Sequence, residues 1–132
     1  MEPLPIPSQF DHQDYMTLET DRRDGTPVTT PVWFVEQEGV LYFRTMASSG
    51  KVKRLRRNPS LRVVASDFRG NPLGEWIDAT AVLQDAAETR RINDLMTQKY
   101  GMKKWFLDIF GGMNRGEQVI YAVHLKTGET SL

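Results

Sequence analysis

The chain has 132 residues, which suits one domain with a buried hydrophobic core. Hydrophobic residues make up 39% and charged residues 26%, and 17 basic side chains balance 17 acidic ones, which argues against nucleic acid as the main partner. Cysteine is absent and the two histidines, His12 and His124, stand far apart, so thiol chemistry is excluded and no metal-ligand spacing exists.

The N-terminal residues predict an extended arm rather than a targeting segment. Prolines stand at alternate positions up to Pro7, which favours an extended chain over residues 1–8. A signal peptide would need a basic start followed by an apolar run, and no apolar stretch approaches the ~18 residues of a membrane span. We therefore expect a cytoplasmic protein with no membrane contact, folded as a single domain over residues 1–132.

The first third of the chain predicts an antiparallel meander. Residues 15–22 form the first expected strand, and Asp24-Gly25 marks a hairpin turn because both residue types tolerate positive φ. Residues 26–35 form the second, which Pro27 and Pro31 should interrupt and leave with an open edge, because proline cannot donate to a ladder. Residues 40–45 form the third.

The rest of the chain adds helices to three further strands. We expect a short helix over residues 51–58, stopped by Pro59, then strands over residues 61–68 and 75–84. Asp85 should cap a second helix, with Glu88 three positions later and a buried stripe that ends at Gly101. A shorter helix over residues 103–110 and a last strand over residues 119–125 follow. Six mostly antiparallel strands with inserted helices predict a mainly β fold closed into a barrel.

The densest chemical signal lies where the third strand meets the first helix. Its hydroxyl groups, glycine and cations suit a phosphate, because a helix N-terminus offers unpaired N–H groups and a positive dipole end. The alternative is a solvated basic helix behind an ordinary Ser-Gly cap, and the residues alone leave both open. The candidate phosphate-binding residues are Thr45, Ser48, Ser49, Lys51, Lys53 and Arg54.

A second signal lies in the proline-containing strand. A strand opened by proline exposes backbone N–H and C=O groups that can bond the edge of a flat ring system, and neighbouring hydroxyls can assist. The alternative is an ordinary core strand, since Thr, Val and Trp are common in strands. The candidate ring-binding residues are Thr29, Thr30, Pro31, Val32 and Trp33.

These segments together resemble a known family. Residues 24–34 (DGTPVTTPVWF), residues 45–59 and residues 76–81 (WIDATA) are similar to the pyridoxamine-phosphate-oxidase-like flavoproteins, and most similar to the branch of small proteins labelled as users of the deazaflavin coenzyme F-420. The similarity extends over residues 14–125. It implies a split β-barrel homodimer with cofactor at the subunit interface, the ring along residues 29–33, and the phosphate held by the segment of Thr45, Ser49, Lys51 and Lys53.

The resemblance also implies a redox function in which the cofactor, F-420 or FMN, carries the hydride and no side chain is catalytic. Oxidases of the family have Arg where this chain has Gly50, which should open the phosphate site on one side, although Arg54 could compensate. The cations after Gly50 then favour F-420, whose acidic tail could follow them. A C-terminal arginine segment that holds vitamin B6 is absent, so that substrate is not expected.

Two other classes of function remain open. The first is a non-catalytic flavin or haem binder or sensor of the same fold, and the second is a nucleic-acid module built on the basic helix, against which the zero net charge speaks. The expected substrate is a small unsaturated or quinone-like molecule. Trp105, Phe106 and Arg115 could border the site or serve only packing and loop structure.

Overall fold

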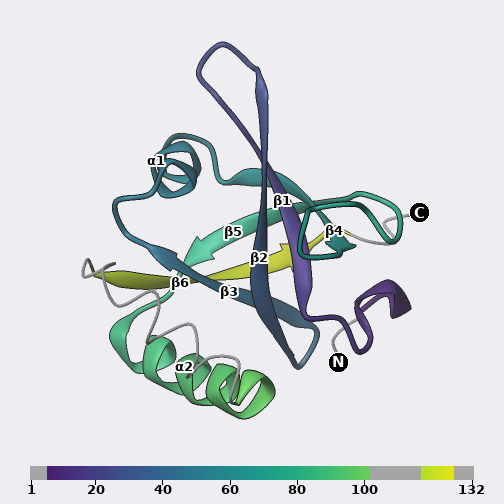
Figure 1. Cartoon of the computed structure of the whole chain (residues 1–132). Helices are drawn as coiled ribbons and strands as arrows, with labels where there is room; N and C mark the ends of the chain where they lie inside the picture. Colours follow the sequence, from purple (N-terminus) through teal and green to yellow (C-terminus); the bar gives the residue numbers. More distant parts are fainter. Residues whose placement is uncertain (1–5, 102–116, 127–132) are drawn as a thin grey trace.

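A computed structural model describes residues 6–101 and 117–126 of the chain. Six antiparallel strands close into a barrel in the order β1-β2-β3-β6-β5-β4, with β4 returning to β1 (Figure 1). This confirms the mainly β fold and the six-stranded barrel expected from the sequence. The elements in chain order are η1 (Ser8–Phe10), β1 (Tyr15–Asp21), β2 (Pro27–Gln37), β3 (Val40–Met46), α1 (Gly50–Arg57), β4 (Ser60–Ser66), β5 (Ile77–Leu83), α2 (Ala86–Tyr100) and β6 (Gln118–Leu125).

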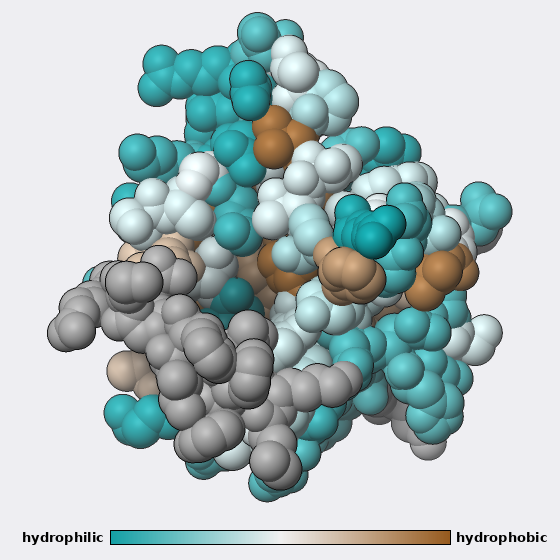
Figure 2. All heavy atoms as spheres, viewed as in Figure 1, coloured by the Kyte–Doolittle hydropathy of each residue, from teal (hydrophilic) through white to brown (hydrophobic). Residues whose placement is uncertain are grey.

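The interior of the barrel is filled by the inward-facing residues of every strand. Phe34 and Phe43 are fully buried there, and Phe10 from η1 packs its ring edge-on against Phe34. The face shown in Figure 2 is mostly polar, and its apolar residues form separate spots rather than one continuous patch. Most of the hydrophobic residues thus lie inside the barrel or beneath the helices, whereas Phe68, Leu73, Val82 and Leu83 are exposed.

The β2 strand is continuous from Pro27 to Gln37, so the expected interruption by proline is wrong. At the hairpin, Arg22 N–H donates to Thr26 O, so these two residues are a hydrogen-bonded pair of the antiparallel ladder. Every second residue of β2 after Thr26 therefore directs its backbone N–H and C=O groups to β1, namely Val28, Thr30 and Val32. Pro27 and Pro31 alternate with these residues, so their missing N–H groups point away from β1 and cost the ladder nothing.

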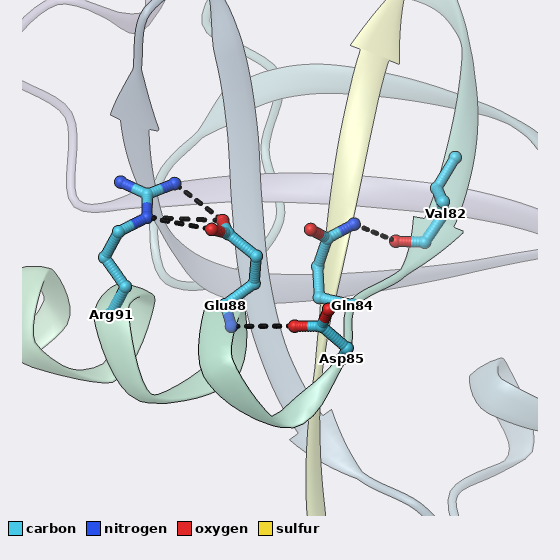
Figure 3. A network of polar contacts seen from close by, with 5 residues as sticks. All are labelled: Val82, Gln84, Asp85, Glu88 and Arg91. Carbon is cyan, nitrogen blue, oxygen red and sulfur yellow. Dashed lines mark hydrogen bonds and ion pairs between the residues drawn. The ribbon is translucent and has the colours of Figure 1, made fainter.

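The two helices begin within one residue of the expected positions, α1 at Gly50 instead of residue 51 and α2 directly after Asp85. Ser49 caps α1, and Asp85 caps α2 by accepting a hydrogen bond from Glu88 N–H at 2.9 Å. Glu88 does not complete the reciprocal bond of a capping box; its carboxylate pairs instead with Arg91 at 2.7 Å (Figure 3). The buried residues of α2 are Ile92, Met96 and Tyr100. Gly101 ends the helix at φ 48°, in the left-handed region that glycine tolerates.

Other boundaries differ from the expected ones. The β4 strand ends at Ser66 because the Asp67 carboxylate accepts hydrogen bonds from Arg69 N–H and Asn71 N–H and so starts a turn. The β5 strand begins at Ile77 instead of residue 75. Ser8, placed in the extended arm by the sequence, belongs to η1, and residues 1–5 of that arm and the expected helix over residues 103–110 lie outside the described residues.

Candidate functional site

The first part of the site is an open edge of β2. This strand pairs with β1 over residues 27–33, whereas its pairing with β3 begins only at Phe34. Within residues 6–101 and 117–126, no strand covers the second edge of residues 27–33. The alternation described above directs the N–H groups of Thr29 and Trp33 and the carbonyl of Pro31 to that edge. These groups can hydrogen-bond the rim of a flat heterocycle.

The second part is the N-terminus of α1. Val52 N–H donates to the Ser49 hydroxyl at 3.4 Å, and that hydroxyl lies 3.4 Å from the hydroxyl of Thr45. Thr45 is the last buried residue of β3, so the strand delivers its hydroxyl directly to the cap. The first turn of α1 contains no acidic residue and carries the cation Lys51. A helix start of this composition favours an anion.

The structure brings these two parts together in one pocket. The pocket has a volume of about 450 Å³ and draws its walls from four elements. Lys51 is half-buried in it, and burial together with the charge of Arg54 lowers the pKa of the ammonium group. The residues that line the pocket are Pro31, Val32 and Trp33 from β2, Arg44 and Thr45 from β3, Lys51 from α1 and Met96 from α2.

The charges of the described lining residues are all of one sign. Among these residues Arg44 and Lys51 are the ionisable groups, and no carboxylate accompanies them. Arg44 donates to the Asn93 side chain of α2 at 3.2 Å, which directs the guanidinium across the outer side of β3. Two cations beside the apolar surfaces of Val32, Trp33 and Met96 suit a ligand that is flat, largely apolar and negatively charged.

Trp33 forms the aromatic wall of this pocket. Its indole stacks on the ring of Tyr100, with the ring centroids 4.3 Å apart and the planes inclined by 7°. Tyr100 is the last residue of α2, and its ring is buried between this helix and the outer face of the barrel. Trp33 therefore presents one face of its indole to a fixed partner on α2.

Arg54 lies beside the start of α1. Its Nε donates to the hydroxyl of buried Thr20 at 2.7 Å, and its Nη1 lies 2.8 Å from the position that a Cβ on Gly50 would occupy. Burial and the neighbouring charges of Arg22 and Arg57 lower the pKa of this guanidinium. The space beside Gly50 is thus occupied by the guanidinium of Arg54, the residue that the sequence offered as a compensating cation.

The remaining predicted residues lie around the pocket rather than in its lining. Ser48 and Lys53 are exposed next to the cap, and Thr29 and Thr30 lie farther along β2 toward the hairpin. Because side chains alternate along a strand, that of Thr30 is on the inner face of the barrel with Val32, and that of Thr29 is on the outer face with Trp33. Of the other cations of α1, Arg57 bonds to the carbonyl of Asp21. Trp105, Phe106 and Arg115 lie outside the described residues.

Two lining residues were missed by sequence reasoning. Arg44 is the one charged residue of residues 40–45 and directly follows the apolar run of residues 40–43, and that isolation was a usable signal. Met96 has the helical spacing of a buried stripe with Ile92 and Tyr100, and nothing in this spacing shows that the stripe continues into a pocket.

Other hollows of the described chain have different chemistry. One of about 330 Å³ lies on the outer wall of β1, β4 and β5, where Glu19 and Arg62 already pair at 2.7 Å. Another of about 240 Å³ is lined by Phe10, His12 and Lys99, among others. The described part of the chain contains no group of three His, Cys, Asp or Glu side chains that could hold a metal ion. Nor does it contain a helix long and apolar enough to cross a membrane.

Comparison with known proteins places this geometry in context. Residues 7–130 match the family described as pyridoxamine 5'-phosphate oxidase. No curated protein matches the chain.

Several solved structures share the fold. The heme storage protein HutZ from Vibrio cholerae is 15% identical, with a TM-score of 0.66 and coverage of 89% of this chain and 84% of that one. General Stress Protein 26 from Bacillus anthracis is 20% identical, with a TM-score of 0.60 and coverage of 92% and 86%. An F420 reductase is 21% identical, with a TM-score of 0.53 and coverage of 92% and 95%.

Proposed function

Because the chain belongs to the pyridoxamine 5'-phosphate oxidase family, we propose that its pocket holds a flavin-type cofactor, F-420 or FMN, and that the protein transfers a hydride between this cofactor and a small organic substrate. The observation that carries the proposal is the pocket itself. It joins the open edge of β2 to the capped, cationic start of α1, so a ring site and an anion site lie in one cavity.

Each wall of the pocket has a role in this proposal. The backbone of residues 31–33 bonds the rim of the ring, and the indole of Trp33 limits its position. The hydroxyls of Thr45 and Ser49, the first N–H groups of α1 and the ammonium of Lys51 hold the phosphate. The bound cofactor supplies the hydride chemistry, so the chain binds, orients and shields, and needs no nucleophile of its own.

The choice between the two cofactors depends on the far side of the phosphate. FMN ends in a dianionic phosphate and gains from an enclosing cation, whereas F-420 continues into an acidic tail. Arg54 stands beside Gly50, although it is not among the described residues that line the pocket. In the proposal its guanidinium is the cation that would enclose a terminal phosphate, and this role favours FMN. The exposed cations Lys53 and Arg56 lie beyond that point and suit a tail. The proposal therefore includes both cofactors, and their relative affinities for the protein distinguish them.

A homodimer is part of the proposal. The open edge of residues 27–33 and the exposed side chains of Val82 and Leu83, at 45% and 52% exposure, are surfaces that a second copy can cover. A partner at the open edge would also shield the bound ring from water. The family resemblance, which places the cofactor between two subunits, agrees with this arrangement.

A non-catalytic binder of the same fold is the second candidate, since one solved structure of this fold is described as a heme storage protein. Haem iron usually takes a histidine or another protein ligand. Both histidines of this chain are exposed: His12 lines a separate pocket beside Phe10, and His124 lies on β6. The lining of the proposed site contains neither of them, which favours the redox function over haem storage.

The experiment that tests the function uses the purified protein with each reduced cofactor and a panel of quinones and enones. The proposal predicts oxidation of bound FMNH₂ or reduced F-420 by at least one acceptor, faster than in the absence of protein. A matched variant, Lys51→Gln, should lose the effect at low cofactor concentration. Lys126→Gln, at an exposed lysine that lines the separate hollow of β1, β4 and β5, should keep it. Binding without any enzyme-dependent oxidation would support the storage function instead.

A further inference from the structure

The last turn of α2 holds the open edge of β2 through one side chain. The Tyr100 hydroxyl accepts a hydrogen bond from Phe34 N–H at 2.8 Å and lies 2.6 Å from the carbonyl of Phe34. It also lies 2.7 Å from the carbonyl of Asp14, so its single proton is donated to one carbonyl or the other. Tyr100 is 3% exposed, and this hydroxyl is therefore fully engaged with backbone.

The position of these bonds is informative. The β1–β2 ladder runs from the Asp21–Pro27 pair to the Tyr15–Trp33 pair, and the next pair would join Asp14 to Phe34. At that point the Tyr100 hydroxyl bonds both residues. The Tyr100 hydroxyl therefore ends the β1–β2 ladder at Phe34. This is also the residue at which the open edge of β2 ends and pairing with β3 begins.

The ring of Tyr100 acts on the neighbouring residue. It stacks on the Trp33 indole with 4.3 Å between the centroids, and Trp33 lines the pocket whereas Tyr100 does not. Lys99 adds a further bond to the backbone of Phe34, from Nζ to Phe34 O at 2.7 Å. One residue of α2 thus fixes both the backbone at the end of the open edge and the orientation of the pocket's aromatic wall.

We propose that Tyr100 is a positioning residue for the cofactor site, which fixes the indole of Trp33 and the hydrogen-bonding edge of β2 without touching the ligand. The inference rests on the proposed function in that it assigns a cofactor to the pocket. Its two parts are separable, because the hydroxyl fixes the edge and the ring fixes the indole. Burial raises the pKa of the hydroxyl, which accordingly stays protonated and able to donate at neutral pH.

The test compares Tyr100→Phe, which keeps the stacked ring, with Tyr100→Leu, which removes both contacts. Ile92→Val is the control, since it removes a buried methylene from the same face of α2. For cofactor-free protein, we expect the Trp33 emission to shift to the red and its anisotropy to fall in Tyr100→Leu, and to change little in Tyr100→Phe and in the control. The Trp33 contribution is isolated by subtracting the spectrum of each variant carrying Trp33→Phe.

With the wild-type protein's tighter cofactor, we expect Tyr100→Leu to raise the Kd on the order of tenfold and Tyr100→Phe by about threefold, measured on the folded fraction. Ile92→Val should bind as wild type does even if its Tm falls further. Unchanged Trp33 emission and unchanged Kd in Tyr100→Leu overturn the proposal, as does an equal loss in the control.

If wild type binds neither cofactor, the proposed function fails, and the emission of the cofactor-free variants still decides whether Tyr100 fixes Trp33. Should Tyr100→Leu not fold, the affinity of Tyr100→Phe decides, and wild-type affinity there overturns the role of the hydroxyl.

Discussion

The guanidinium of Arg54 occupies the space beside Gly50, with Nη1 2.8 Å from where a Cβ on residue 50 would stand. The two positions are one helical turn apart on the same side of α1, so a residue with a side chain at position 50 and Arg54 compete for one volume. A Cβ at position 50 would contact only the end of the flexible Arg54 side chain. This side chain can move away, but it would then lose its hydrogen bond to Thr20.

A double replacement tests whether Arg54 supplies the cation missing at position 50. Arg54→Ala should weaken FMN binding by about 1.5–3 kcal/mol, the value of a charge-assisted hydrogen bond. Gly50→Arg in the same background should restore much of the loss, because the vacated volume accepts the new side chain. Isothermal titration of the single and double variants measures both effects. Unchanged FMN affinity in Arg54→Ala would place Arg54 outside the phosphate site, and failure of Gly50→Arg to recover any affinity would show that the two positions are not interchangeable.

Lys51 should matter through charge rather than folding. Lys51→Ala is expected to weaken cofactor binding by about 1.5–3 kcal/mol, since its ammonium lies in the pocket lining beside the helix start. The Tm of the cofactor-free protein should hardly change. Lys126→Ala, at an exposed lysine that lines the separate hollow of β1, β4 and β5, is the control and should bind as wild type does. An equal loss of Tm in the empty Lys51 variant would show that Lys51 is structural.

Lys99 should make stability depend on pH. Burial lowers the pKa of its ammonium from 10.5 to about 8, with the charge of Asp14 acting in the opposite direction. Between about pH 8 and 10.5 the unfolded chain therefore binds more protons at this residue than the folded chain, so stability rises with pH. Burial raises the pKa of the Tyr100 and Tyr121 hydroxyls, so their ionisation in the unfolded chain near pH 10 opposes this trend, and the useful window is pH 8–9.5.

The measurement is urea unfolding across that window for wild type and Lys99→Met, which keeps the length of the side chain without the charge. The free energy of unfolding of wild type should rise with pH relative to that of the variant. Parallel curves would mean that the ammonium of Lys99 is as well solvated as in the unfolded chain.

The protein should be a homodimer in solution. The uncovered edge of residues 27–33 and the exposed Val82 and Leu83 are the surfaces on which the expectation depends. Sedimentation at micromolar concentration should give a species of twice the chain mass of 15.1 kDa. A single species of one chain mass, with and without cofactor, would contradict the dimer.

Sequence patterns predicted where the strands and helices of this fold lie in the chain better than which strands pair with each other. Asp24-Gly25 marks the first hairpin, and Asp85 and Gly101 bound α2, because turns and caps depend on residues close in the chain. The placement of β6 between β3 and β5 does not follow from any such pattern. Alternation shows which face of a strand is buried but not which strand lies beside it.

The site was predictable to the same extent. Two segments could be selected separately, one by its prolines and hydroxyls and one by its Ser-Gly cap and cations, and both line the pocket through Trp33 and Lys51. Arg44 and Met96 enter the pocket only through the packing of β3 and α2. The bonds of the Tyr100 hydroxyl to Asp14 and Phe34 join residues that lie 86 and 66 positions away, a separation that no local pattern records.

The most direct test of the account is a titration of cofactor-free protein with FMN and with F-420, followed by tryptophan emission in wild type and in Trp33→Phe. Each titration is carried out at low and high salt, because exposed tail contacts weaken with ionic strength whereas an enclosed phosphate does so less. The account predicts saturable quenching by at least one cofactor, most of which is lost in Trp33→Phe because that indole lines the pocket. Absence of quenching by both cofactors, or the same quenching in Trp33→Phe, would contradict it.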